Sequence, residues 1–423
     1  MEQRLALKGN IVYTPQLGEV TTLPDSYLLL ENGLVAGTCA DLPDKWADAP
    51  LRDYGDSLLL PGLTDLHIHA PQYGFRGLGL DMELLKWLDA YAFPEEARYA
   101  DDGYAAYAYR IFADSLRQSF TCRANIFATV HNSATAILAE LIAASGLVAN
   151  IGKVSMDRNC PADLNEGAQA LTAAAVWILE MQGRYENIRP IITPRFVPSC
   201  SGALLTALGR LAAEYNLPVQ SHLSESTQEV AWVRRLEPKS LHYAGAYNRY
   251  GLLDGHPTVM AHCVHLNDAE KYLLKGHGVF IAHCPQSNFN LLSGAAPIRS
   301  YLQANLKVGL ATDMAGGAHI SMLRAIQDAV TVSKLRAVLA GTGEEPLSLP
   351  EAFYLASKGG GEFFGKVGSL EEGYAADVLV IDDTLLSPRG LTLGQRLERV
   401  ICLADERHLQ AKYVNGREVL IND

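Results

Sequence analysis

The expected fold is decided by one stretch of the chain, PGLTDLHIH at residues 61–69. Within it, Leu63–His69 is an apolar, strand-like run, and side chains two positions apart on a strand point to the same face. His67 and His69 therefore point the same way at the end of the run. This pair indicates a shared metal ion, because functional side chains of a barrel lie at the C-terminal ends of its strands. The alternative is a pair of polar residues that merely ends a strand.

The sequence beyond this stretch repeats the same unit. Most of the later strand-like runs are followed by helical periodicity, and Leu84, Trp87, Leu88 and Tyr91 show it after the first run. The other seven runs are Cys122–Val130, Val148–Met156, Arg189–Phe196, Val219–Leu223, Thr258–Cys263, Val279–His283 and Val308–Thr312. Eight such units predict an α/β fold, a (β/α)₈ TIM-type barrel. An open doubly wound sheet is disfavoured, since no Gly-rich phosphate loop follows an early strand.

Both ends of the chain have a β character. Leu5–Tyr13 and Ser26–Leu30 are strand-like near the start, and Asp377–Ile381 and Gln410–Val414 are strand-like near the end. Asn-Gly pairs at 32–33 and 415–416 predict tight turns. We therefore expect residues 1–60 and 369–423 to form one small β-sandwich domain, and residues 61–368 to form the barrel.

Bulk composition excludes several classes of protein. The 423 residues are 48% hydrophobic and carry a net charge of −12, with no basic stripe, so binding to nucleic acid or to a membrane surface is not expected. No apolar run is long enough to cross a bilayer, and Met1–Asn10 has no signal core. The seven scattered cysteines contain no C-x-x-C pair, which favours a reducing compartment. We expect a cytoplasmic protein.

Two further strand ends complete a predicted metal site. His222 ends the fifth run and Asp313 follows the eighth, so both meet His67 and His69 on one barrel face. Three imidazoles and one carboxylate suit zinc and leave a position for water. Taken singly, His222 could be a structural histidine and Asp313 a helix N-cap.

Three other strand-end residues are candidates for chemistry or binding. Glu225, three residues after His222, is placed to carry protons, unless it only caps the next helix. His262 ends the sixth run and could hydrogen-bond the attacking oxygen or the tetrahedral centre. His283 ends the seventh run and is expected to line the pocket; a buried, hydrogen-bonded histidine is the alternative.

The order H-x-H, His, His, Asp on successive strands resembles the amidohydrolase superfamily over the whole chain. Within it, the local strings resemble those of guanine deaminases. These strings are PGLTDLHIHAPQ at 61–72, YAFPE at 91–95, TPRF at 193–196, AHCPQSN at 282–288 and TDMAGG at 312–317.

The resemblance implies zinc-dependent deamination of guanine to xanthine, and by analogy a homodimer. It implies that His67, His69, His222 and Asp313 bind zinc, and that Gln72, Arg195 and Phe196 hold the purine. It also implies that Glu225, His262 and Asp313 act in catalysis. Relatives with two metal ions use a modified lysine at the end of the fourth strand, where this chain has TPRF, so one ion is expected.

Other functions stay open at this point. A deaminase or chlorohydrolase of the same superfamily could act on a related purine, pterin or triazine. A catalytically silent barrel could serve as a scaffold, although none of the expected ligands is missing. A cytidine-deaminase-type enzyme is excluded, because the H-x-E and P-C-x-x-C pattern is absent.

Overall fold

The predicted barrel is present in the computed structural model, which describes residues 4–341 and 343–420. Its parallel strands run through two four-stranded sheets, in the orders β5-β6-β7-β9 and β11-β12-β13-β14. The strands are β5 (Leu63–His69), β6 (Thr121–Phe127), β7 (Val148–Gly152), β9 (Ile188–Pro190), β11 (Val219–Leu223), β12 (Thr258–His262), β13 (Phe280–His283) and β14 (Lys307–Leu310).

Backbone contacts close the two sheets into one barrel. A parallel bridge between Ile192 and Val219 joins the β9 side to β11. On the opposite side, the Asp313 amide donates to the His67 carbonyl at 2.9 Å, just beyond β14. The predicted runs at 148–156 and 189–196 are each interrupted. Their second parts, β8 (Val154–Ser155) and β10 (Thr193–Pro194), pair with each other as a short parallel extension.

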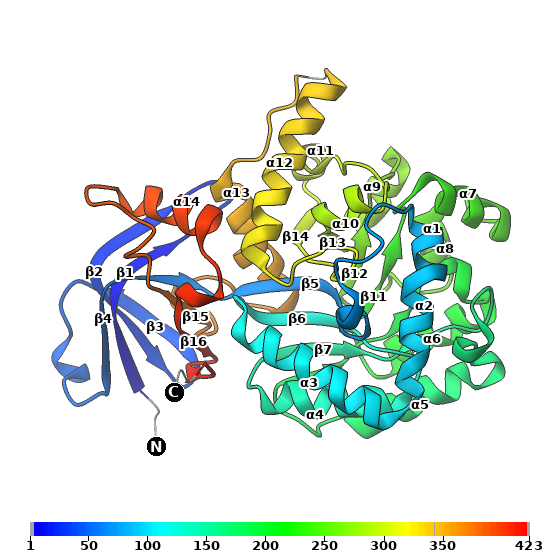
Figure 1. The fold of residues 1–423 in the computed structure, drawn as a ribbon, viewed down its shortest axis with the longest axis horizontal. Helices are drawn as coiled ribbons and strands as arrows, with labels where there is room; N and C mark the ends of the chain where they lie inside the picture. The colour runs from blue at the N-terminus through cyan, green and yellow to red at the C-terminus, as the bar shows by residue number, and fades with distance from the viewer. Residues whose placement is uncertain (1–3, 342, 421–423) are drawn as a thin grey trace.

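Helices cover the outside of the barrel (Figure 1). Asp101 caps α3 by accepting a hydrogen bond from the Tyr104 amide, and the helix buries Tyr109, Phe112 and Leu116 against the strands. The helices of the barrel region are α1 (Leu84–Trp87), α2 (Phe93–Ala97), α3 (Asp102–Gln118), α4 (Asn132–Ala144), α5 (Ala170–Met181), α6 (Gly202–Glu214), α7 (Thr227–Leu236), α8 (Tyr243–Arg249), α9 (Asp268–Gly276), α10 (Pro285–Asn290), α11 (Ile298–Gln303), α12 (Met322–Ala340) and α13 (Leu349–Tyr354).

The two ends of the chain pair in one sheet beside the barrel (Figure 1). Its order is β17-β16-β15-β4-β1-β2-β3. The strands are β1 (Arg4–Tyr13), β2 (Thr21–Glu31), β3 (Leu34–Cys39), β4 (Leu51–Pro61), β15 (Val378–Ile381), β16 (Leu409–Val414) and β17 (Arg417–Glu418). Helix α14 (Leu393–Leu403) follows β15. The expected two-layer sandwich and the domain limits at 60 and 369 stay predictions.

One buried lysine ties this sheet to the barrel. Lys412 of β16 donates from Nζ to the carbonyl oxygens of Ser119 and Thr121 at 2.8 and 3.0 Å, and to that of Leu116 at 3.4 Å. These carbonyls lie at the end of α3 and the start of β6. The contact holds the terminal sheet against the end of the barrel opposite to the functional strand ends.

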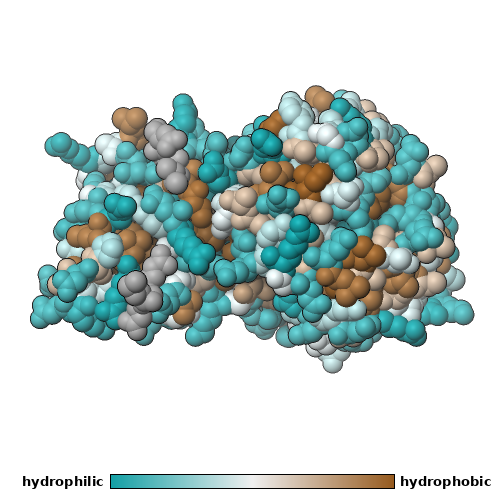
Figure 2. Space-filling view, turned by 90° about the horizontal axis from the view of Figure 1, so that it is seen from below, coloured by the Kyte–Doolittle hydropathy of each residue, from teal (hydrophilic) through white to brown (hydrophobic). Residues whose placement is uncertain are grey.

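The face seen in Figure 2 is mostly hydrophilic, with hydrophobic residues in separate patches. Within the described ranges, no helix has the length and apolar character needed to cross a membrane.

Candidate active site

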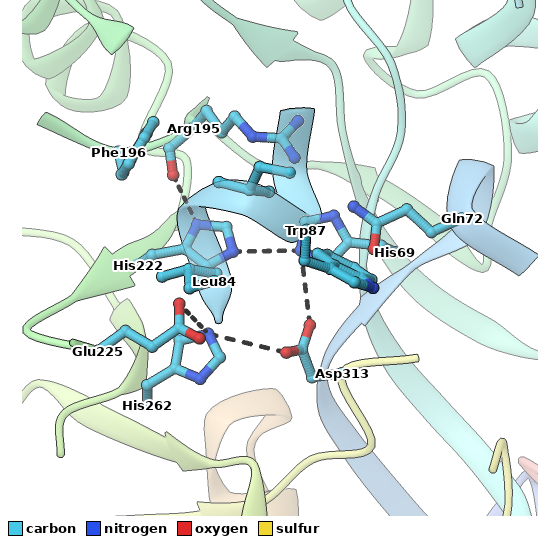
Figure 3. Close-up of a pocket in the computed structure, with 11 residues that line it drawn as sticks. His69, Gln72, Leu84, Trp87, Arg195, Phe196, His222, Glu225, His262 and Asp313 are labelled. Atoms are coloured by element: carbon cyan, nitrogen blue, oxygen red, sulfur yellow. Dashed lines mark hydrogen bonds and ion pairs between the residues drawn. The ribbon is translucent and has the colours of Figure 1, made fainter. Parts of the chain in front are cut away.

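The predicted site residues meet in a pocket at the C-terminal ends of β5, β11 and β12 and just beyond β14 (Figure 3). The empty space of the pocket, counted together with the solvent at its mouth, is about 400 Å³. Its lining residues are His69, Gln72, Leu84, Trp87, Leu88, Arg195, Phe196, His222, Glu225, His262 and Asp313.

The four predicted metal ligands form a buried cluster. Asp313 Oδ1 lies 3.1 Å from His67 Nε2 and 3.7 Å from His69 Nε2. His69 Nε2 lies 3.1 Å from His222 Nε2, as the dashed line in Figure 3 shows. His67, His69 and Asp313 offer ligand atoms that all lie within 4.8 Å of one another. The structure thus brings these four side chains together, as the sequence predicted.

The donor set fits a metal ion. Burial lowers the pKa of His222 well below its ordinary value, and the neighbouring imidazoles lower it further, so the ring is neutral. Its one N–H is on Nδ1, which donates to the Arg195 carbonyl at 2.6 Å. The Nε2 lone pair is therefore directed into the cluster. A ring fixed through its other nitrogen in this way is typical of histidine metal ligands.

The two carboxyl groups of the pocket have opposite tendencies. Burial alone would raise the pKa of Asp313, but His67 and His262 beside it hold that pKa at about 2. Glu225 lies across the pocket, and burial together with the charges of Glu229 and Asp313 raises its pKa well above 4.5. One group therefore stays ionised while the other can hold a proton. Such a separation is typical of acid–base sites.

Glu225 and His262 face each other beside the cluster. Glu225 Oε2 lies 3.3 Å from His262 Nε2, and Ser293 Oγ donates to Glu225 Oε1 at 3.1 Å. His262 is oriented from behind, since its Nδ1 lies 2.9 Å from Asn288 Oδ1. The sequence did not single out Ser293 or Asn288, both of which follow β13.

The substrate-binding predictions have different outcomes. Gln72, Arg195 and Phe196 line the pocket, whereas His283 is absent from its lining. His283 is 1% exposed, and burial lowers its pKa to about 3. No hydrogen-bond partner reaches its Nδ1 within the described part of the chain. Its proposed contact with substrate stays a prediction.

Glu96 is the functional candidate that sequence reasoning missed. Its side chain is 1% exposed and lies between Gln72 and Arg195. Gln72 Nε2 donates to Glu96 Oε1 at 2.8 Å, and the Arg195 guanidinium binds both carboxylate oxygens, at 2.5 and 3.0 Å. The family-like string at 91–95 ends one residue before Glu96, so this string was the sequence feature that could have indicated Glu96.

Apolar side chains cover the pocket. Leu84 and Trp87 come from α1, and Leu88 begins the π-helical turn η3 (Leu88–Ala92). The periodicity of these residues predicted a helix, but it did not show that the apolar face covers a pocket. Behind the cluster, the Phe127 ring contacts His67, His69 and His222 at centroid distances of 4.7 to 4.9 Å. Phe127 therefore forms an apolar wall behind the cluster.

Comparisons with known proteins identify relatives of this chain. A model of the amidohydrolase family matches residues 58–419. Guanine deaminase of Dictyostelium discoideum is 35% identical and covers 97% of each chain, and that of Homo sapiens is 36% identical over 90% of this chain and 87% of the human one. A crystal structure of guanine deaminase from C. acetobutylicum with bound guanine superposes with a TM-score of 0.97, at 43% identity, over 99% of this chain and 100% of the other. Because the family match extends over most of the sequence, this chain belongs to the amidohydrolase family.

Proposed function

We propose that this chain hydrolyses guanine to xanthine and ammonia. The observation that carries the proposal is the position of Gln72 and Arg195 on one side of a pocket whose other side holds the histidine–aspartate cluster. The named activity of the relatives, and the guanine bound in the C. acetobutylicum structure, support the same reaction. The enzyme is a hydrolase of C–N bonds and takes a small-molecule substrate.

We further propose that His67, His69, His222 and Asp313 hold one zinc ion. Nitrogen and carboxylate ligands in this number suit zinc and leave one position open. Bound zinc supplies a Lewis acid and lowers the pKa of water toward neutrality. Relatives with two ions have a modified lysine at this strand end, whereas here Arg195 follows β10 and its guanidinium is bound by Glu96.

The polar side chains of the pocket complement guanine. Guanine presents acceptors at O6 and N7 and N–H donors on its ring and amine. Arg195 has only donors to offer, and Gln72 can offer its carbonyl oxygen. Phe196 provides an apolar wall and is 5% exposed. We propose that these residues hold the purine with its amine-bearing carbon over the cluster.

Proton transfer is proposed to pass through two carboxyl groups. Glu225 takes a proton from the attacking water and gives it to the ring nitrogen beside the amine-bearing carbon. Asp313, whose carboxyl stays ionised beside His67 and His262, accepts the second proton of the water and passes it to the departing amine, which leaves as ammonia. His262 is placed within 3.3 Å of Glu225 and steadies the developing charge. Water adds and ammonia leaves, so the balance is guanine plus water to xanthine plus ammonia.

A panel of free bases tests the proposed function. Ammonia release is measured from guanine, adenine, cytosine, 8-oxoguanine and a pterin, with zinc-loaded enzyme and after chelation. Chelator-sensitive release from guanine, with equimolar xanthine, is the expected result. Ammonia release from another base alone would mean that the substrate is a different base and that the hydrolytic reaction is the same. No ammonia release from any base, despite bound zinc, would favour a scaffold. A homodimer and a cytoplasmic location stay predictions.

A further inference from the structure

Glu96 connects the two side chains that are proposed to read the substrate. It lies on α2, a short helix that continues η3 and the apolar cover of the pocket. Gln72 follows β5 and Arg195 follows β10, so the three residues come from separate parts of the barrel. Figure 3 shows the Gln72 amide and the Arg195 guanidinium on the same side of the pocket. A single carboxylate therefore fixes both groups.

The contact with Glu96 decides which way the Gln72 amide is turned. A carboxylate oxygen only accepts, so the group facing it at 2.8 Å is the Gln72 NH₂. The carbonyl oxygen Oε1 is then directed away from Glu96, and no hydrogen bond to it is made by any described residue. Gln72 is thereby presented to the pocket as an acceptor.

The same contact decides what Arg195 can offer. Two of its five N–H donors are used by Glu96 in a bidentate pair, and the guanidinium carbon lies 5.0 Å from the centre of the Phe93 ring. The remaining donors are held in a fixed plane. The pocket thus combines one oriented acceptor with one oriented set of donors.

We propose that Glu96 is the specificity-determining positioning residue of the site: it locks Gln72 as an acceptor and Arg195 as a donor, which selects 6-oxopurines over 6-aminopurines. A 6-oxopurine offers an N1–H donor beside an O6 acceptor. A 6-aminopurine offers the reverse, an N1 acceptor beside an exocyclic donor. This inference deepens the proposed function and rests on it.

Glu96→Gln is the informative change. The substituted amide keeps the size of the side chain, but it offers a donor as well as an acceptor, so Gln72 can turn over and present its NH₂. Glu95→Gln is the matched control. Glu95 lies on the same helix, is 9% exposed and pairs with Arg98 Nη1 at 2.8 Å, and it does not line the pocket.

Binding is measured on zinc-loaded enzyme with two unreactive or poorly reactive probes. Hypoxanthine carries the 6-oxo pattern without the amine that guanine loses, and adenine carries the reversed pattern. We expect wild-type and Glu95→Gln enzymes to prefer hypoxanthine to the same extent, and Glu96→Gln to reduce that preference about tenfold to a hundredfold. Melting temperature and zinc content are recorded for each variant.

A double-mutant cycle separates positioning from a merely structural role. If Glu96 acts through Gln72, then Glu96→Gln changes the preference much less in a Gln72→Ala background than in the wild type. Equal effects in both backgrounds would overturn the inference, as would an unchanged preference in Glu96→Gln while guanine turnover by the wild type is normal. A wild type that neither deaminates guanine nor prefers hypoxanthine would reject the proposed function, and this inference with it.

Discussion

Replacement of Glu225 by glutamine removes the proposed proton carrier and leaves the rest of the pocket in place. Ser293 Oγ can still donate to the amide oxygen, and the backbone amide of residue 225 keeps its 2.8 Å hydrogen bond to Glu229. The amide cannot take up or release a proton at neutral pH. We therefore expect kcat to fall about 10²- to 10⁴-fold, which corresponds to roughly 2.7–5.4 kcal/mol of barrier.

The same substitution, which is expected to lower kcat, is expected to raise the stability of the fold. Burial and nearby charge raise the pKa of Glu225 above 4.5 in the folded chain, so the unfolded chain loses its proton first as the pH rises. Stability contributed by this group is present at low pH and is lost as the pH rises above 4.5. In metal-free protein at neutral pH, Glu225→Gln is expected to melt at a higher temperature than the wild type.

The loss of kcat is measured as xanthine formation under saturating guanine, with the zinc content recorded for each variant. The change in stability is measured by a thermal melt of chelated protein. Unchanged zinc content, unchanged hypoxanthine binding and a large loss of kcat are expected. A variant that keeps kcat within tenfold of the wild type at full zinc occupancy would refute the role of Glu225. A lower melting temperature of the chelated variant would refute the account of its burial.

Three further changes test other parts of the structure. Asp313→Ala is expected to lose zinc and activity together, and retention of one zinc per chain by mass spectrometry would contradict its place in the cluster. Lys412→Met leaves the carbonyls of Leu116, Ser119 and Thr121 without their common donor, so thermal melts should show a loss of roughly 3 kcal/mol or more, with kcat/KM of the folded enzyme unchanged. Burial lowers the pKa of His283 to about 3, so the unfolded chain takes up a proton below pH 6.5 before the folded chain does. The stability of the fold therefore falls as the pH drops toward 3. His283→Asn should unfold at a lower pH than the wild type, and an unchanged acid midpoint would count against this effect of burial.

Much of the barrel could be predicted because strand signals are local. The runs at 63–69 and 219–223 coincide with β5 and β11 to the residue. A short apolar segment is bounded by turn residues, so both ends of the strand can be located from the sequence. The run at 148–156 was expected as one strand and is broken at Lys153, whose side chain pairs with Glu166. A pairing with a loop thirteen residues away leaves no mark on strand periodicity.

The site was predictable where position on a strand decided it. In a barrel, functional side chains lie at the C-terminal ends of the strands. This rule placed the side chains of His67, His69, His222 and Asp313. Glu96 could not be placed this way, because it lies on a helix and its partners Gln72 and Arg195 are 24 and 99 residues away. The apolar face of Leu84, Trp87 and Leu88 was visible as periodicity, but which surface it covers depends on the tertiary fold.

We propose that this cluster and this pocket together deaminate guanine. The most direct test follows xanthine and ammonia release from guanine while bound zinc is removed by a chelator and then restored. We predict that both products appear in equal amounts, that their rate is proportional to zinc up to one ion per chain, and that restoring zinc restores the rate. Guanine turnover that persists in zinc-free protein, or zinc-loaded protein that leaves guanine intact, would rule out zinc-dependent deamination of guanine by this pocket.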